Sequence, residues 1–125
     1  MRCRRGDEGQ AAVELALVLP LVCALLLAVV QVGLVVHAQL VVVHAAREAA
    51  RAAAVDSHAG AAYAAVVGGT PLDVRRVEVD VRGAGDDRVE ATVRYSFATD
   101  VPLVGALVDD LELVASAVMR VEHEG

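Results

Sequence analysis

Residues 15–36 read LALVLPLVCALLLAVVQVGLVV, and this stretch decides the fold. It opens a run of 32 residues, from Leu15 to Ala46, that contains no Asp, Glu, Lys or Arg. As a helix, its 22 residues would be about 33 Å long, which matches a bilayer core of about 30 Å. A helix that is apolar on every face has more apolar surface than the rest of a 125-residue chain can bury. The sequence therefore predicts a transmembrane helix over residues 10–36.

The apolar run is too long to be a removable secretory signal. The apolar part of a signal peptide spans about 7–15 residues and is followed by a cleavage site of small residues. Here Leu15 to Val30 alone is 16 residues long. The span is therefore predicted to remain in the protein as a single membrane crossing.

The distribution of arginines predicts the orientation of this crossing. Arg2, Arg4 and Arg5 lie just before the span, whereas residues 47–125 carry eight Arg against 14 acidic residues. Basic residues near a membrane helix favour the cytoplasmic side. We expect the N-terminus in the cytoplasm and an acidic C-terminal head outside it, anchored in the cell membrane.

Residues 37–69 are predicted to form a helical stalk beyond the membrane. The segment AQLVVVHAAREAARAAAV, residues 38–55, contains no Gly or Pro, and Ala is the best helix former. Opposite its charged residues runs a stripe of small side chains: Val41, Ala45, Ala49 and Ala52. A break is expected at 56–60, then a short helix over 61–67 that the Gly and Pro residues of 68–71 end.

The remaining residues, 70–125, are predicted to form a small β-rich head. The apolar period changes to two over 77–82 and 89–97, joined by a glycine-containing connection that suits an antiparallel hairpin. After a loop with Pro102 and Gly105, residues 111–121 provide a third strand. Its alternate side chains are expected to face the small-residue stripe of the helix: Leu111, Leu113, Ala115, Ala117 and Met119. The predicted fold is α+β, with a three-stranded antiparallel sheet packed on a long N-terminal helix.

The composition argues against several classes of function. Aromatic residues make up 2% of the chain and the net charge is −6, which suits neither base stacking nor binding to a polyanion, so no nucleic acid is expected as a partner. The two Cys and four scattered His lack the spacing of a metal site. No nucleophile motif or phosphate-binding loop occurs. We expect no metal, no cofactor and no enzymatic activity.

Glu14 is the one acidic residue that touches the apolar run. Charged groups at the edge of a membrane span are candidates for function, although an acid near a helix N-terminus is also stabilised by the helix dipole. Gly9 lies five positions before Glu14, after a short leader with three arginines. Gly6 does not offer the same spacing, because the residue five positions after it is Ala11.

This arrangement resembles the class III prepilin signal of type IV pilin-like proteins. The string AVELALVLPL at 12–21, then Gln39, then AAREAAR at 45–51, is more specifically similar to the TadE-like family, pseudopilins of tight-adherence (Flp) pilus systems. The similarity covers residues 9–52, and the head lies beyond it.

The resemblance implies a processed, pilin-like membrane protein. A prepilin peptidase would cut after Gly9, remove residues 1–9 as a leader and make Gln10 the first residue and Glu14 the fifth. The Glu14 carboxylate would then pair with the new α-amino group of a neighbouring subunit, each charge compensating the other in apolar surroundings. Pro20 lacks an N–H and would let the helix bend during packing, although proline is also common in ordinary membrane helices.

The function predicted from this resemblance is that of a minor pilin or pseudopilin in the assembly of a tight-adherence pilus. Its expected partners are the prepilin peptidase, other pilin-like subunits, the pilus assembly platform and membrane lipid. The alternative is an uncleaved single-pass membrane protein whose acidic head binds a partner in the envelope.

Overall fold

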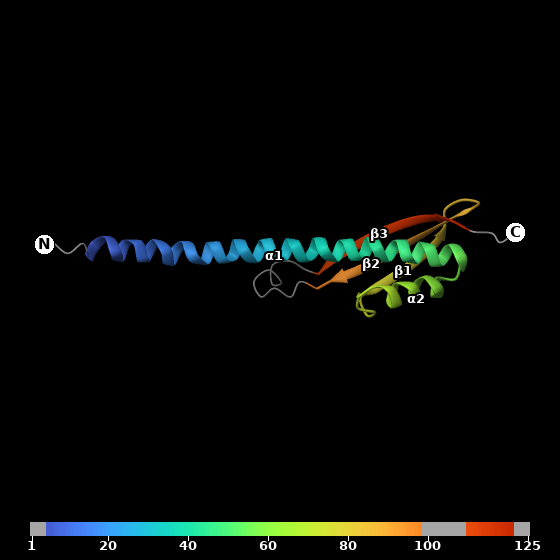
Figure 1. Cartoon of the computed structure of the whole chain (residues 1–125), viewed down its shortest axis with the longest axis horizontal. Helices are drawn as coiled ribbons and strands as arrows, with labels where there is room; N and C mark the ends of the chain where they lie inside the picture. The colour runs from blue at the N-terminus through green and yellow to red at the C-terminus, as the bar shows by residue number, and fades with distance from the viewer. Residues whose placement is uncertain (1–4, 99–109, 122–125) are drawn as a thin grey trace. The chain divides into compact units, whose positions relative to one another are not determined.

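A computed structural model describes residues 5–98 and 110–121 of the chain. Along the chain the elements are α1 (Arg5–Val55), α2 (Ala59–Gly69), β1 (Val77–Gly83), β2 (Arg88–Phe97) and β3 (Leu111–Arg120), as labelled in Figure 1. The predicted loop with Pro102 and Gly105 lies outside the described residues. The chain divides into two compact units, Met1–Gly33 and Leu34–Gly125.

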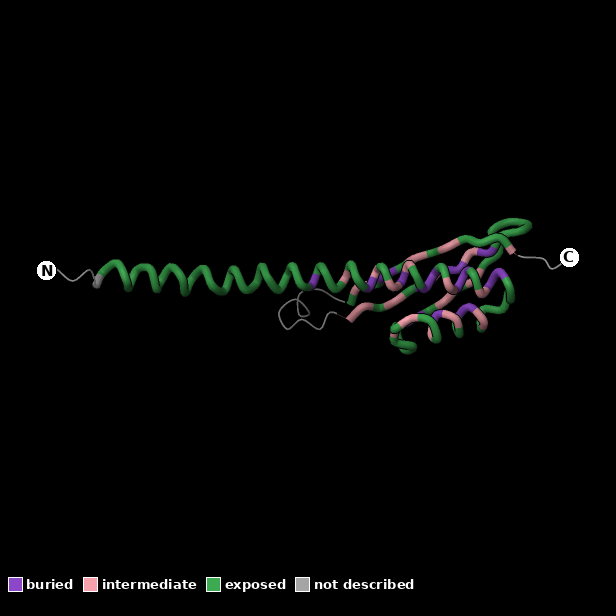
Figure 2. The backbone as a smooth tube through the Cα atoms, in the orientation of Figure 1, coloured by how far each residue is buried: buried purple, intermediate pink, exposed green. Residues whose placement is uncertain are grey.

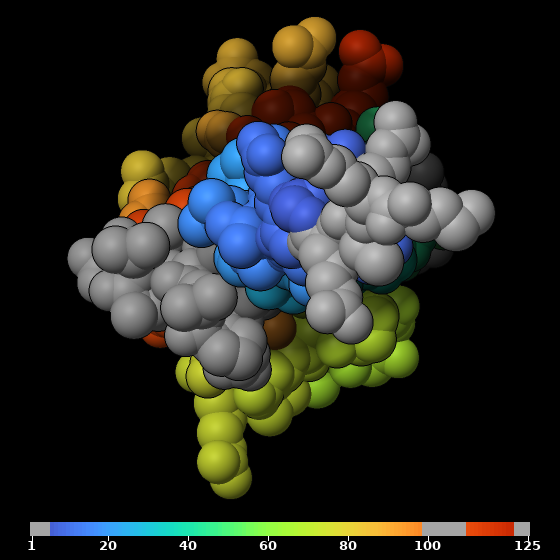
Figure 3. Space-filling model, turned by 90° about the vertical axis from the view of Figure 1, so that its left-hand side faces the viewer, coloured from blue at the N-terminus to red at the C-terminus, as the bar shows by residue number. Residues whose placement is uncertain are grey.

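The first unit consists of the N-terminal part of α1, and its apolar side chains are exposed. From Gly6 to Val30 every residue is exposed, as the continuous green of Figure 2 shows. Figure 3 looks onto this end of the molecule, where the blue side chains lie at the surface. The helix Gly6–Val55 is long and apolar enough to cross a membrane. An exposed apolar surface of this size is typical of contact with lipid or with other proteins, and it suggests that the helix anchors the protein in a membrane.

The second unit contains a three-stranded antiparallel sheet in the order β1-β2-β3. Val77 faces Tyr95 across the first strand pair, and Val93 faces Ala115 across the second. The first hairpin turns through residues 84–87, where Gly85 adopts a φ of 121° that favours glycine. The predicted α+β layout, a long apolar helix followed by this sheet, is therefore confirmed.

The core of the second unit is built from small side chains of the helices and the sheet. The buried residues of α1 are Ala38, Val42, Ala45, Ala46, Ala49, Ala50, Ala53 and Ala54. They cluster with Ala62 and Val66 of α2 and with Val77, Val89, Ala91, Val93 and Leu113 of the sheet. Alanine has no side-chain atoms beyond Cβ, so the α1 side of this core is built almost entirely from small side chains. The sheet thus packs on α1 as predicted.

The buried face of α1 is wider than the predicted stripe of small residues. Ala45 and Ala49 are fully buried, but Val41 and Ala52 are only partly buried, and the buried face extends round to Ala53. The reason is that both α2 and the sheet contribute to this core, so two neighbours cover the helix instead of one.

Strand β3 turns toward the core as expected, except at its end. Leu113 is buried and its inward neighbours Leu111, Ala115 and Ala117 are partly buried. Met119 is 37% exposed, so it is less well covered than the other inward-facing side chains of this strand. It lies near the C-terminal end of α1, in a groove with Arg51, Ala54, Val55 and Arg120, where few side chains remain to cover it.

The break between the two helices is shorter than predicted. Helix α1 ends at Val55 and α2 already starts at Ala59. The Asp56 carboxylate accepts a hydrogen bond from the backbone N–H of His58 at 3.1 Å and also contacts the imidazole Nδ1. These hydrogen bonds, that of the side chain first, lower the pKa of Asp56. The turn formed by Asp56 and His58 explains why the chain changes direction between α1 and α2. Gly60 is not needed for this turn, because it lies within α2.

Candidate functional site

The predicted assembly residues lie in the first turns of α1. The helix begins at Arg5, and its first turn contains Asp7 and Glu8. The favourable effect of a helix dipole on a carboxylate fades beyond the first turn. It therefore accounts for Asp7 and Glu8 and does not account for Glu14, which lies in the third turn and is exposed. The carboxylate at the edge of the apolar span needs another explanation.

Helix geometry places Gln10 and Glu14 on the same face. Residues four apart are neighbours on a helix surface. Both side chains are exposed, and apart from the nearby backbone of the helix itself no described atom lies within 4 Å of where a Cβ on Gly9 would be. Gly6 and Gly9 each cost about 1 kcal/mol of helix stability relative to alanine, so this end of the helix opens easily. In the structure, Gly9 and Gln10 are both part of this helix.

Pro20 lies further along the same helix and does not interrupt it. Helix α1 continues through Pro20, whose side chain is exposed. The ring leaves the carbonyl of Ala16 without its usual intrahelical hydrogen bond. Six residues separate Glu14 from Pro20, which is about 9 Å along the axis, so the two residues do not form one site.

The structure gives Gln39 and Gln31 environments that the sequence did not indicate. The Gln39 amide donates a hydrogen bond of 3.4 Å to the backbone carbonyl of Val114, joining the C-terminal part of α1 to β3. Gln31 is 8% exposed, and its side-chain oxygen has no hydrogen-bond partner among the described residues. A lone amide within an apolar run was the available signal for Gln31. No sequence signal could have paired Gln39 with a residue 75 positions away.

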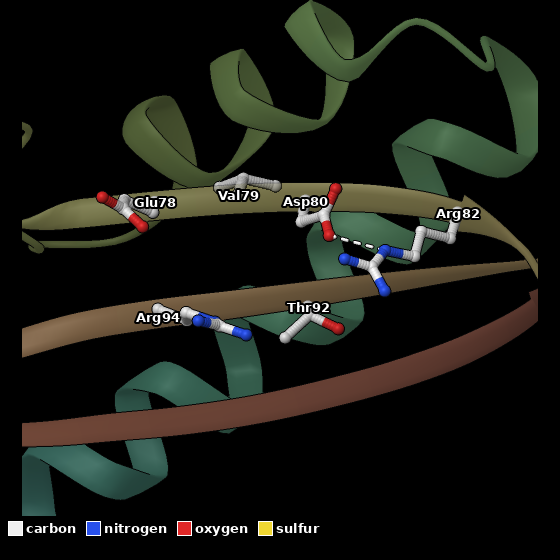
Figure 4. Close-up of a pocket in the computed structure, with 6 residues that line it drawn as sticks. All are labelled: Glu78, Val79, Asp80, Arg82, Thr92 and Arg94. Atoms are coloured by element: carbon white, nitrogen blue, oxygen red, sulfur yellow. Dashed lines mark ion pairs between the residues drawn. The ribbon is translucent and has the colours of Figure 1, made fainter.

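The outer face of the sheet is strongly charged. Side chains of β1 and β2 line a shallow groove on it: Glu78, Val79, Asp80, Arg82, Thr92 and Arg94 (Figure 4). Asp80 and Arg82 form an ion pair at 2.8 Å, drawn as the dashed line in Figure 4. Across the strands Glu78 faces Arg94, and opposite charges at such positions stabilise a sheet. This face is suited to polar contacts at a surface.

Comparison with known proteins bears on the N-terminal part of the chain. The family model described as TadE-like protein matches residues 9–51. No curated protein and no solved structure matches the chain. The matched segment contains all four predicted assembly and processing residues, Gly9, Gln10, Glu14 and Pro20, and also Gln39. The predicted resemblance to the TadE-like family is thus confirmed over residues 9–51.

Proposed function

We propose that this protein is a minor pilin or pseudopilin of the TadE-like type, a structural component in the assembly of a tight-adherence pilus. The observation that carries the proposal is the TadE-like segment at 9–51, which begins at Gly9 and places an exposed Glu14 at the edge of an exposed apolar helix. The role is non-enzymatic. Its partners are the prepilin peptidase, other pilin-like subunits and the assembly platform.

The proposed mechanism starts with the removal of residues 1–9. Cleavage after Gly9 removes Arg2, Arg4 and Arg5 together with the old helix start, and it creates a positively charged amino group on Gln10. This ammonium and the Glu14 carboxylate of a neighbouring subunit carry opposite charges at the edge of their apolar spans. Pairing them offsets the cost of keeping each charge in apolar surroundings. Assembly is therefore favoured by a pair of charges that does not exist before cleavage.

Processing provides the test of this function. In cells that carry the prepilin peptidase, the purified protein is expected to begin at Gln10, with 116 residues left from 125. Intact mass and N-terminal sequencing measure this directly. As a control, Gly9→Ala should block cleavage, whereas Gly6→Ala, the glycine without the spacing to Glu14, should not. An intact leader on the wild-type protein would contradict the proposal and favour an uncleaved membrane protein whose acidic head binds an envelope partner.

We further propose that the head lies outside the cytoplasm. The three leading arginines against an acidic C-terminal region support this orientation. In a background without Cys23, Asp86→Cys is expected to react with an impermeant thiol reagent on intact spheroplasts, because Asp86 is exposed in the first hairpin. In cells without the peptidase, native Cys3 should react only after the membrane is disrupted. The reverse pattern of labelling would place the head in the cytoplasm.

A further inference from the structure

Three arginines gather at one end of the sheet. Arg75 and Arg76 precede β1, and Arg94 lies near the end of β2; all three are exposed. They line one shallow polar groove together with Glu78, Ser96 and Glu112. Among the residues that the structure describes, the ion pairs within 4.0 Å are Asp56 with His58 and Asp80 with Arg82. Arg75, Arg76 and Arg94, which we call the proximal arginines, belong to neither pair; Glu78 faces Arg94 across the strands, and Glu78 and Glu112 line the same groove.

Hydrogen bonds show which residues of α1 lie at the same position along the helix axis as the proximal arginines; we call this position their level. Arg94 faces Val114 across the β2–β3 pair, and the Val114 carbonyl accepts the hydrogen bond from Gln39. Arg94 is thus at the level of Gln39. The N–H of Ser96 donates to the carbonyl of Arg76 at 3.0 Å, which places Arg76 two residues beyond this level.

Strand β3 and the C-terminal part of α1 run in the same direction, as Figure 1 shows. Val114 contacts Gln39, whereas Met119 shares a groove with Arg51. The two intervals agree in length, about 17 Å along the strand and about 18 Å along the helix. Within the second unit, the start of β3, and with it Arg76, therefore lies on the N-terminal side of Gln39 along α1.

This level coincides with the predicted surface of the membrane. Gln39 comes three residues after Val36, the last residue of the apolar stretch, which is about 4.5 Å along a helix. Arg76 lies two strand residues, about 7 Å, from the level of Gln39 in the direction of Val36. It is therefore close to the level at which the apolar stretch ends. The headgroup layer on each side of a bilayer is about 5–7 Å thick. For the predicted span that ends at Val36, these distances would place Arg75, Arg76 and Arg94 at the depth of the lipid phosphates.

We propose that the proximal arginines bind the phosphates of lipid headgroups and hold the head against the surface of the membrane that α1 spans. A guanidinium group donates two parallel hydrogen bonds to a phosphate, and anionic lipids attract basic residues close to the surface. The inference rests on anchoring by the apolar helix, but it holds for either orientation of the chain. It requires no pilus partner.

The same sheet provides a matched set of arginines at its other end. Arg82 is the last residue but one of β1, Arg88 begins β2 and Arg120 ends β3. Arg88 faces Arg120. Six strand residues separate Arg88 from Arg94, about 20 Å, which exceeds the distance of about 8–10 Å over which salt screens exposed charges. We therefore expect no electrostatic attraction between these three residues, the distal arginines, and the lipid headgroups.

A tryptophan reporter can test the contact, because the chain contains no Trp. Val74→Trp places the reporter beside Arg75 at a position that is 47% exposed. The full chain is reconstituted in nanodiscs of phosphatidylcholine with phosphatidylglycerol, and brominated lipids quench the fluorescence of tryptophans at the bilayer. Each basic residue near the surface favours the bound state by about fivefold. Exchange of Arg75, Arg76 and Arg94 for Gln is therefore expected to remove most of the quenching, as is high salt.

The control variant exchanges Arg82, Arg88 and Arg120 for Gln, which changes the net charge equally and should leave the quenching unchanged. Equal quenching in both variants and the parent, or equal loss in both variants, would overturn the inference. Inorganic phosphate at constant ionic strength should not reduce the quenching; if it did, the arginines would bind free anions instead of lipid. Flotation with the bilayer measures anchoring separately, so a failure of the helix to insert is distinguished from a head that stays away from the surface.

Discussion

Glu14→Ala is expected to abolish co-purification and crosslinking of this protein with other pilin-like subunits, while its abundance and its cleavage stay near normal. The substitution removes a charge from the edge of the span, so insertion into the membrane should be unchanged or slightly favoured. It leaves the α-amino group of a neighbouring subunit without its carboxylate. An uncompensated charge in apolar surroundings costs about 3–5 kcal/mol, enough to lower a binding constant by more than a hundredfold.

Two further variants separate the charge from its position. Glu14→Asp keeps the carboxylate on a shorter side chain and is expected to assemble partly. Glu8→Ala removes an acid that lies in the first turn of α1 and that cleavage would discard, so assembly should be unaffected. Crosslinking in intact cells and the number of pili measure the outcome. Normal piliation by the Glu14→Ala protein would show that the carboxylate has no part in subunit contact.

Ala49→Leu is expected to destabilise the head more than any surface substitution. Ala49 has no exposed surface and belongs to the core between α1 and the sheet. Overfilling such a site costs about 1–3 kcal/mol, because neighbouring side chains and backbone must move. In a domain of this size, about 2 kcal/mol lowers the melting temperature by roughly 8–16 °C.

The same exchange at an exposed alanine provides the control. Ala64 lies on the exposed face of α2, and Ala64→Leu should leave the melting temperature nearly unchanged. Unfolding is followed by circular dichroism in detergent and by hydrogen exchange of the buried Val93 amide in β2. If Ala49→Leu melted like the parent protein, the helix and the sheet would not share a core, and the packing described above would be wrong.

The sequence was most informative where a pattern repeats over many residues. The run after Leu15 lacks charged residues throughout, and alternation in β1 and β2 marks both strands to within one residue. The position of Glu14 after Gly9 was informative because the resemblance to the TadE-like family, matched over residues 9–51, rests on local spacing. Each of these features depends only on residues that are close together in the sequence.

Features that depend on how distant segments meet could not be predicted. The buried face of α1 was placed too narrowly, because nothing in residues 38–55 reveals that α2 will cover a second side. The cluster of Arg75, Arg76 and Arg94 was missed for the same reason. Its members come from two separate parts of the chain, and only the register of β1 on β2 brings them together.

The sharing of the core between helix and sheet limits how this protein can be separated from its anchor. Of the fifteen buried apolar residues in the described part of the chain, eight belong to α1, between Ala38 and Ala54. A protease that cut within that segment would divide the core itself and would release unfolded strands. Shedding of a folded head into the surroundings is therefore possible only by a cut before Ala38. The anchor and the domain that it displays are inseparable over most of the helix they share.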